Sequence, residues 1–243
     1  TEKLLAGTDS EITTVGYYCN PIQYAEHRKT LENVICTAGK FGATHVSTFA
    51  GAWEGKPVES AYEEFGKVFR ELADLAEEKG VKLGIENCLM DGTWEHATCN
   101  IGFNPKAWEV MFEEVKNDNF GVGWEPTHQM VQLIDPVTEL RKWCKKIVHI
   151  HGKDATIDWD AVRHSGISGA VPFVWHRMPG FGDTNWRDII SILRSNGYED
   201  DICIEGYHDP VYSGELEMTG QLHALNYLKW CRGGDFTPTP WEK

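Results

Sequence analysis

Residues 147–154, with the sequence Ile-Val-His-Ile-His-Gly-Lys-Asp, combine a β-branched apolar run with a polar end. The run favours a strand, and residues two apart on a strand point to the same face. His149 and His151 therefore share a face, and His151 lies nearer the end of the strand. We interpret His151 as a metal ligand and His149 as its hydrogen-bonded neighbour one layer below. Asp154 falls in the following loop, where it either orients a ligand or serves as a turn residue.

Three other short apolar runs end in a glutamate: residues 81–86, residues 120–125 and residues 201–205. A carboxylate buried at the end of a strand is costly unless it is paired or bound to a cation. Any one such glutamate is more often a plain loop residue, but four chemically matched strand ends indicate a shared cation. Carboxylate and imidazole donors together suit Mn²⁺, Co²⁺, Fe²⁺ or Zn²⁺, and Mg²⁺ less well. The sequence therefore predicts one divalent metal ion held by Glu86, Glu125, His151 and Glu205.

Strands and helices alternate along the whole chain. We predict strands at residues 12–19, 44–50, 81–86, 120–124, 147–151, 171–175 and 201–205. We predict helices at about residues 24–40, 60–80, 104–115, 135–146, 184–196 and 215–230. Alternation of this kind predicts a parallel sheet with helical crossovers.

The alternative to a barrel is an open doubly wound sheet, which usually carries a glycine-rich fingerprint after its first strand. No such fingerprint is present, so we predict an α/β fold of the (β/α)8 TIM-barrel type. A closed barrel has eight strands, whereas the sequence offers seven. We therefore expect the first strand and helix to precede Thr1. We expect residues 1–243 to form a single domain, with an extended C-terminal tail from about residue 233.

Local signals fix several helix starts. Asn104-Pro105 and Asp135-Pro136 each place a capping side chain directly before a proline suited to the first helical position. Ser60, followed three residues later by Glu63, matches the pattern of a capping box. We expect helices to begin at all three places.

Composition narrows the class of protein. The 243 residues are 41% hydrophobic and carry a formal charge of −14, which repels phosphate backbones and anionic membranes. No run of 18 apolar residues is present, so we expect neither a nucleic-acid partner nor a membrane span. The seven cysteines are odd in number and include no Cys-x-x-Cys pair, which excludes a disulfide framework or zinc ribbon. We expect most of them to be buried thiols of a cytoplasmic protein.

Five motifs, taken in order, resemble the xylose-isomerase-like TIM-barrel superfamily, and the match runs from about residue 12 to residue 228. They are Gly84-Ile85-Glu86-Asn87-Cys88, Glu125-Pro126-Thr127-His128, His149-Ile150-His151-Gly152-Lys153-Asp154, Pro179-Gly180-Phe181-Gly182-Asp183, and Gly197-Tyr198 leading to Ile204-Glu205. This superfamily includes tagatose/psicose 3-epimerases, inosose-processing enzymes and endonuclease IV. The resemblance implies the same four ligands, a missing first strand and Mn²⁺ as the favoured ion. The chain departs from the family at Glu125, where an aspartate is usual.

The resemblance also implies a mechanism. In the epimerases that the chain resembles, the equivalents of Glu86 and Glu205 bind the metal and flank the sugar. We therefore expect these two residues to form an acid/base pair that moves a proton next to a carbonyl. The metal ion would stabilise the resulting enediolate as a Lewis acid.

Further side chains are candidates for substrate binding. His128 would hold a substrate hydroxyl or a metal-bound water, unless it is simply a loop histidine. Lys153 and Arg177, with the neighbouring His176, are polar contacts or surface charges. Trp53 and Tyr18 lie near strand ends, where aromatic rings stack on sugars or pack in the core. No phosphate-binding motif is present, which favours an unphosphorylated sugar.

The leading functional prediction is a metal-dependent isomerase or epimerase of a ketose or keto-sugar. The alternative is a metal-dependent lyase or dehydratase acting on a keto-sugar or 3-keto-glycoside, because both reactions begin with the same proton abstraction. An endonuclease IV-like nuclease is remote, since the strands that end at Tyr17-Tyr18-Cys19 and Ala50-Gly51 lack a histidine there. A barrel that binds without catalysing is a further alternative. By family resemblance we expect a homo-oligomer, either a dimer or a tetramer.

Overall fold

The computed structural model describes residues 5–234 and 237–239 and divides into two compact units. Unit 1 comprises Thr1–Gln132, Lys145–His151 and Asp200–Ile202. Unit 2 comprises Leu133–Cys144, Gly152–Glu199 and Cys203–Lys243. The predicted single domain stays a prediction, and the predicted tail from residue 233 falls partly outside the described residues.

The main sheet has six strands in the order β1-β2-β3-β4-β5-β8. Its strands are β1 (Thr14–Gly16), β2 (His45–Thr48), β3 (Lys82–Glu86), β4 (Phe120–Trp124), β5 (Ile147–Gly152) and β8 (Ile202–Ile204). Each neighbouring pair from β1 to β5 is parallel. The predicted α/β class is therefore confirmed, and the carboxyl ends of β3, β4 and β5 lie at one edge of the sheet.

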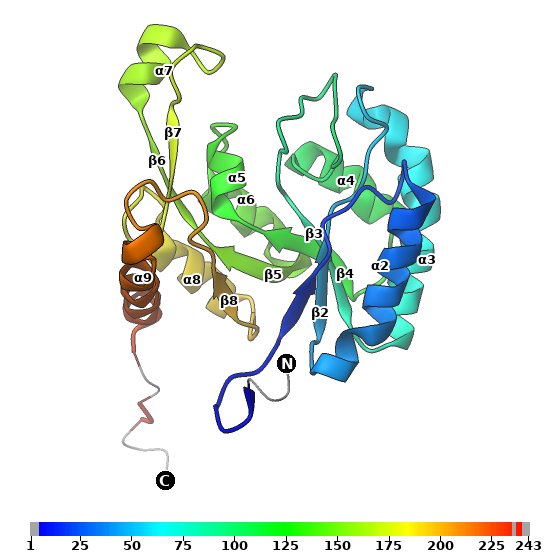
Figure 1. Cartoon of the computed structure of the whole chain (residues 1–243), viewed down its shortest axis with the longest axis horizontal. Coiled ribbons are helices and arrows are strands. Elements are labelled where there is room, and N and C mark those ends of the chain that lie inside the picture. The colour runs from blue at the N-terminus through cyan, green and yellow to red at the C-terminus, as the bar shows by residue number, and fades with distance from the viewer. Residues whose placement is uncertain (1–4, 235–236, 240–243) are drawn as a thin grey trace. The chain divides into compact units, whose positions relative to one another are not determined.

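Unit 1 carries its main helices on one side of its strands, where α2, α3 and α4 lie side by side (Figure 1). The helices of this unit are α2 (Ala25–Ala38), α3 (Tyr62–Glu78), α4 (Pro105–Glu114) and α5 (Pro126–Met130). Apolar side chains at helical spacing along the first three are buried: Leu31, Ile35, Ala38, Phe65, Phe69, Leu72, Ala76, Trp108, Met111 and Phe112. Full burial of one large apolar side chain is worth about 1.5–3 kcal/mol, so these faces fix the helices against the sheet.

The core of unit 1 is partly aromatic. Phe65 and Phe69 stack with ring centroids 4.6 Å apart, and Phe120 of β4 lies 6.1 Å from Phe69. The indole nitrogen of the buried Trp108 donates a hydrogen bond of 2.7 Å to the carbonyl of Gly102. That bond satisfies the N–H group of the fully buried indole ring, which cannot reach water. It also anchors α4 to the loop after β3.

Two of the three predicted helix starts are confirmed. Asn104 accepts a hydrogen bond from the Lys106 amide at 3.0 Å, and Asp135 accepts one from the Val137 amide at 3.0 Å. The capping box at Ser60 is wrong. The Ser60 hydroxyl donates to the carbonyl of Pro57 at 2.6 Å, because a short 3-10 turn over Val58–Ala61 precedes the α-helix and takes up this serine.

Unit 2 contains a hairpin that the sequence did not predict. Strands β6 (Asp154–Ile157) and β7 (Val174–Arg177) pair antiparallel, with helix α7 (Trp159–Ser165) between them (Figure 1). The strand predicted within residues 171–175 is present as β7, shifted to Val174–Arg177, but its expected place in the main sheet is wrong because it pairs with β6. β6 starts two residues after β5 ends, which leaves no room for the long crossover that a parallel neighbour of β5 would need.

The other helices of unit 2 lie where they were predicted. They are α6 (Pro136–Trp143), α8 (Trp186–Ser195) and α9 (Glu217–Arg232). The leucine face expected on α9 is wrong, because Leu222 and Leu225 are exposed and only Leu228 is buried. Asn185 caps α8 by accepting a hydrogen bond from the Asp188 amide at 3.2 Å. Four short 3-10 turns complete the elements: η1 (Gly39–Phe41), η2 (Val58–Ala61), η3 (Cys144–Lys146) and η4 (Gly214–Leu216).

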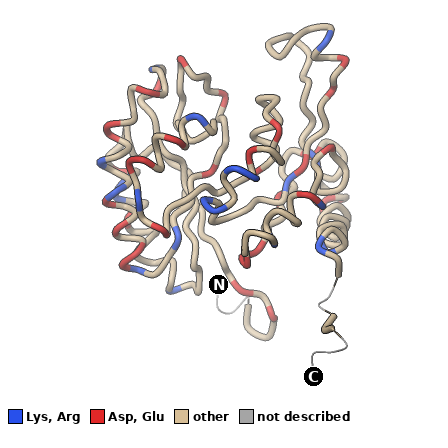
Figure 2. Tube along the Cα trace, turned by 180° about the vertical axis from the view of Figure 1, so that it is seen from behind, with Lys and Arg blue, Asp and Glu red and all other residues tan. Residues whose placement is uncertain are grey.

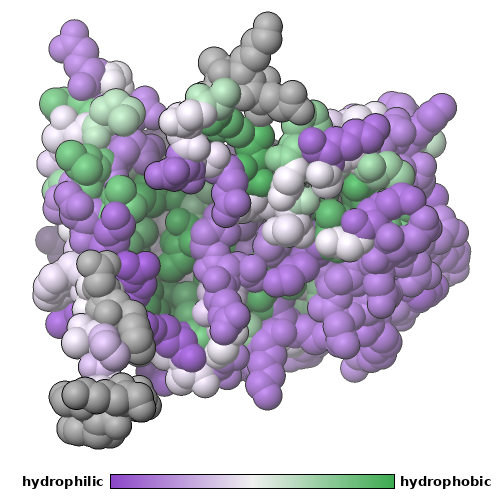
Figure 3. All heavy atoms as spheres, turned by 90° about the horizontal axis from the view of Figure 1, so that it is seen from below, coloured by the Kyte–Doolittle hydropathy of each residue, from purple (hydrophilic) through white to green (hydrophobic). Residues whose placement is uncertain are grey.

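The surface of unit 1 is polar and mixed in charge. Acidic and basic positions alternate along its helices (Figure 2), and hydrophilic residues cover most of the side that carries α2 and α3, at the right of Figure 3. Within the described ranges, the structure contains no helix with the length and apolarity needed to span a bilayer. Of the seven cysteines, all of which lie within the described ranges, only Cys19 and Cys144 are buried, so the expectation that most would be buried is wrong.

Gly121 of β4 provides a test of the packing between β4 and β5. A Cβ atom there would overlap the carbonyl oxygen of Lys146 and lie 2.6 Å from Cγ1 of Val148. We expect Gly121→Ala to lower the free energy of unfolding by about 1–3 kcal/mol, measured by urea denaturation, because β5 must move to admit the methyl group. Gly39→Ala is the matched control, since a Cβ at Gly39 meets nothing within 4 Å. Equal stability of the two variants would contradict this packing.

Candidate metal site

Three of the predicted ligands come together in unit 1. Glu86 is the last residue of β3, Glu125 follows β4, and His151 lies near the end of β5. Glu86 is 7% exposed and Glu125 is fully buried. The donor atoms of these three residues lie within 4.8 Å of one another. Parallel pairing of β3, β4 and β5 thus delivers two carboxylates and one imidazole to the same place, as the sequence predicted.

Two buried asparagines hold the strand ends that carry the carboxylates. The Asn87 side chain donates to the carbonyl of Glu125 at 3.0 Å and accepts from its amide at 2.8 Å. The Asn100 side chain donates to the carbonyls of Glu86 at 2.9 Å and Cys88 at 2.8 Å. These bonds replace the backbone ladder where the strands diverge. Sequence reasoning missed both roles, although the position of Asn87 directly after Glu86 was a usable signal.

Histidines alternate with the carboxylates. His151 Nδ1 lies 2.9 Å from Oε1 of Glu86 and 3.8 Å from Oε2 of Glu125. His128 Nε2 lies 3.4 Å from the same Oε2 of Glu125. The order along the site is Glu86, His151, Glu125 and His128. Each buried negative charge therefore has an imidazole within reach.

Neighbouring charges reverse the effect of burial on His151 and His128. Burial alone would lower the pKa of His151, but the hydrogen bonds that its ring donates to Glu125 and Glu86 outweigh burial and raise this pKa to about 10. Burial likewise opposes the charged form of His128, yet Glu125 and Cys88 raise the pKa of His128 well above its ordinary value. Without a metal ion, protonated His151 and His128 therefore supply the two positive charges that balance the two carboxylates.

His149 behaves in the opposite way, as a supporting residue should. Burial, with the positive charges of His151 and His45, lowers the pKa of His149 to about 4. Its Nδ1 lies 3.3 Å from the hydroxyl of Thr14, and its ring lies 4.9 Å from the ring of His151. The neutral His149 therefore packs beneath His151, in the arrangement predicted from strand alternation.

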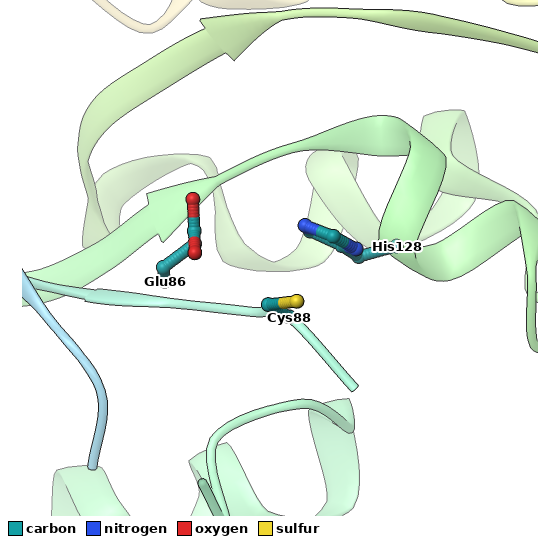
Figure 4. A group of neighbouring side chains, drawn as sticks. All are labelled: Glu86, Cys88 and His128. Carbon is teal, nitrogen blue, oxygen red and sulfur yellow. The ribbon is translucent and has the colours of Figure 1, made fainter. Parts of the chain in front are cut away.

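The donor chemistry of this cluster fits a divalent cation. Two carboxylates supply two negative charges, and an imidazole that gives up its proton supplies a nitrogen donor. Glu125 is the residue that departs from the family pattern, yet its longer side chain still reaches His151 and His128. A second group of donors, Glu86, Cys88 and His128, also lies within 4.8 Å in unit 1 (Figure 4).

Glu205 and Lys153 lie in unit 2. Glu205 follows β8, and its amide donates to the carbonyl of Gly152 at 3.0 Å. Its carboxylate pairs with the ammonium of Lys153 at 2.7 Å, and Lys153 is only 3% exposed. The assignments of Glu205 as a ligand and of Lys153 as a substrate contact stay predictions.

Two aspartates organise unit 2. Asp154 is buried and accepts hydrogen bonds from the amides of Ala155, Gly180, Gly182 and Thr184. Burial raises the pKa of Asp154 despite these bonds. These contacts favour the interpretation of Asp154 as a residue that organises a loop over its interpretation as a residue that orients a metal ligand. Sequence reasoning missed the second, Asp209, which ion-pairs with Arg177 at 3.3 Å and accepts from the Met178 amide at 2.7 Å.

The remaining predicted substrate residues stay predictions. Arg177 combines its ion pair to Asp209 with a position 5.7 Å from the ring of Phe181. In unit 1, Tyr18 is 42% exposed and lies 5.1 Å from the ring of Phe49, while Trp53 is half-buried. Two of the predicted substrate residues contact a predicted ligand of their own unit: His128 contacts Glu125 in unit 1, and Lys153 contacts Glu205 in unit 2.

Comparison with known proteins gives one family. A sequence model described as xylose isomerase-like TIM barrel matches residues 2–229. An inosose dehydratase of Clostridium tetani is 26% identical over 182 residues, which cover 73% of this chain and 57% of that protein. An inosose dehydratase of Clostridium perfringens is 25% identical over 227 residues, covering 90% of this chain and 73% of that protein. The chain thus spans a little over half of the first relative's length.

Solved structures agree on the fold. The IOLI protein with a bound zinc atom aligns with a TM-score of 0.67 at 18% identity, covering 94% of this chain and 77% of that one. The 3-keto-D-glucoside 4-epimerase YcjR of E. coli aligns with a TM-score of 0.68 at 14% identity, covering 95% and 83%. At sequence identities this low, the structural similarity establishes a shared fold but not a shared function.

The opposite pKa shifts of His149 and His151 can be measured by NMR of the metal-free protein. We expect the His151 ring to titrate near pH 10 and the His149 ring near pH 4. In His151→Gln the pKa of His149 should rise toward its ordinary value, because a positive neighbour has been removed. His164→Gln, at an exposed position of α7, should leave both titrations unchanged. A His151 ring that titrates near pH 6.5 would contradict its placement between two carboxylates.

Proposed function

Because the chain belongs to the xylose isomerase-like TIM-barrel family, we propose that it is a metal-dependent lyase acting on a keto-sugar or cyclic keto-polyol. The reaction removes a proton from the carbon next to the carbonyl and then expels a hydroxyl from the following carbon. The observation that carries this proposal is the buried cluster of Glu86, Glu125 and His151 at adjacent parallel strand ends. Curated relatives named as inosose dehydratases support elimination as the outcome.

Glu86, Glu125 and His151 would hold the metal ion, with Mn²⁺ as the favoured species. Glu205 is proposed as the fourth ligand from its place directly after β8, which matches the place of Glu125 directly after β4. The ion would polarise the substrate carbonyl as a Lewis acid. The zinc atom in the structure of the IOLI protein supports a divalent ion of this kind without fixing its identity.

Glu86 and Glu205 are the proposed acid/base residues. In the first step, one carboxylate takes the proton from the carbon, and the C–H electrons form an enediolate. In the second step, these electrons form a carbon–carbon double bond and the C–O bond of the neighbouring hydroxyl breaks. The leaving oxygen takes up a proton and departs as water. Base catalysis by a positioned carboxylate is worth on the order of 10²–10⁴ in rate.

The ion pair between Lys153 and Glu205 favours elimination over epimerisation. Elimination needs a proton donor at the leaving oxygen, and the buried ammonium of Lys153 lies 2.7 Å from the Glu205 carboxylate. Epimerisation needs only a second acid on the opposite face of the carbon. We therefore propose Lys153 as the donor that protonates the departing hydroxyl. Epimerisation is the second candidate, supported by the pair of proposed carboxylates.

Other parts of the proposal rest on the sequence. His128 would hold a substrate hydroxyl, Arg177 a polar group, and Trp53 and Tyr18 the C–H faces of an unphosphorylated sugar. Self-association as a dimer or tetramer and a cytoplasmic location are proposed on the same basis. A nuclease function is not proposed, because the chain carries a net charge of −14.

Product analysis in D₂O tests the reaction. Protein loaded with Mn²⁺ is incubated with an inosose, with a 3-keto-glucoside and with a panel of ketoses, and the products are followed by NMR. We expect a water-loss product, whereas deuterium incorporated without loss of a group would establish epimerisation instead. Release of the aglycone from the 3-keto-glucoside would establish that the protein is a lyase that acts on a 3-keto-glycoside. Absence of both exchange and elimination over the whole panel would defeat the proposal.

Glutamate variants test the catalytic pair. We expect Glu86→Gln and Glu205→Gln each to lower kcat by about 10²-fold or more, because an amide cannot accept the carbon-bound proton. Glu63→Gln is the control, since its carboxylate is 84% exposed on α3. Full turnover by either active-site variant would rule out its residue as the base.

Replacement of Lys153 separates the two steps. Lys153→Met keeps the length of the side chain and removes the proton donor. We expect loss of water to slow more than exchange of the carbon-bound proton for deuterium, because only the second step needs the ammonium. Equal slowing of both steps would assign Lys153 to binding alone.

A further inference from the structure

We propose that Glu86, Cys88 and His128 form a second cation site in unit 1, suited to a thiophilic divalent ion such as Zn²⁺. One carboxylate oxygen, the Cys88 sulfur and one imidazole nitrogen lie within 4.8 Å of one another. Figure 4 shows the side chains of Glu86 and His128 pointing toward one another, with the sulfur of Cys88 on the side that faces His128. This site is distinct in its donors from the Glu86, Glu125 and His151 cluster, and it does not depend on the proposed reaction.

Local structure explains why these three donors converge. Cys88 follows Glu86 by two residues on an extended segment, and side chains two apart share a face. Asn100 fixes this segment, because its amide donates to the carbonyls of both Glu86 and Cys88. The donors are therefore held in place by the backbone before any ion binds.

The third donor comes from a different element. Glu125 precedes α5, so His128 lies one turn into this short helix and faces back toward the strand ends. The His128 carbonyl accepts a hydrogen bond of 2.8 Å from the side chain of Gln132, which secures the end of the turn. The imidazole reaches the Glu125 carboxylate at 3.4 Å. Its position is thus set by contacts other than those to Cys88.

The donor types decide which ion fits. A set of one thiolate, one imidazole and one carboxylate, with a fourth place for water, is typical of tetrahedral Zn²⁺. Sulfur favours Zn²⁺ over Mn²⁺ and Mg²⁺, whereas the oxygen-rich cluster with His151 suits the harder ions. Binding requires Cys88 to act as a thiolate and release its proton to solvent. The two sites share Glu86, whose two carboxylate oxygens allow it to serve either one or to bridge both.

Cys88 differs in this respect from the other cysteines. Among the described residues, it is the cysteine that belongs to a group of donors able to hold an ion. Cys36 and Cys203 are exposed, and Cys144 is buried without such a group. A packing role alone would not require a histidine and a carboxylate within reach of its sulfur.

Cobalt spectroscopy of the full-length, metal-free chain tests the site. Co²⁺ bound to a thiolate shows sulfur-to-metal charge-transfer absorption in the near ultraviolet. We expect this absorption on titration of the wild type, loss of it in Cys88→Ser, and its disappearance when Zn²⁺ is added. An excess of Mn²⁺ should not remove it. His128→Asn should weaken Co²⁺ binding by about tenfold or more, the smallest loss usual for a residue at a metal site.

Two control variants make the assignment specific. A Cys36→Ser/Cys203→Ser double variant removes the exposed thiols and should keep the absorption. His151→Gln disrupts the oxygen-rich cluster and should also keep it, which separates this site from the one that the proposed function needs. Denaturation curves establish that each variant is folded. Absence of the absorption in the wild type, or its persistence in Cys88→Ser, would overturn the proposal.

Discussion

Two carboxylates that are buried side by side need a positive charge between them, and the architecture of unit 1 meets this need. At 4 Å two like charges repel by about 4 kcal/mol at an effective dielectric constant of 20. Glu86 and Glu125 escape this cost because His151 lies within ion-pair distance of both. The three residues come from β3, β4 and β5, so the neutralisation depends on the parallel register of these strands. A divalent ion would take the place of the His151 proton and bring one more positive charge, which is enough to balance both carboxylates.

The register itself depends on close backbone approach and on amide side chains. Gly84 of β3 pairs with Gly121 of β4, and a Cβ at Gly84 would lie 3.3 Å from the nitrogen of Gly123. The absence of side chains there lets the strands pack against Val148 of β5, 3.2 Å from the same position. Beyond these glycines, Asn87 continues the pairing by bonding both backbone groups of Glu125. The carboxylates are thus positioned by residues that do no chemistry.

The periodic features of this fold could be predicted from sequence, and the features that depend on tertiary contacts could not. Strand alternation predicted that His151 would lie at the strand end with the carboxylates, and the structure has it there, because this placement depends only on the period of two. The hairpin of β6 and β7 escaped prediction, because short strands with exposed residues such as Trp175 carry no clear periodic signal. Asp209 was missed as well, since its contacts with Arg177 and with the Met178 amide join residues that are distant in sequence. Asn100 was missed for the same reason.

Because Glu86 is shared by two groups of donors, it cannot bind an ion in each group and act as a base at the same time. Glu86 belongs to two sets of donors, and it is also the proposed base of the reaction. A carboxylate bound tightly to a cation is a weaker base, because the positive charge stabilises its ionised form. A hard ion held by Glu125 and His151 leaves one oxygen of Glu86 able to take a proton. A thiophilic ion held by Cys88 and His128 would draw on that remaining oxygen. Binding of a hard ion would therefore leave Glu86 able to act as a base, whereas binding of a thiophilic ion would lower its basicity. The ion that the protein binds would thus decide whether Glu86 can take a proton.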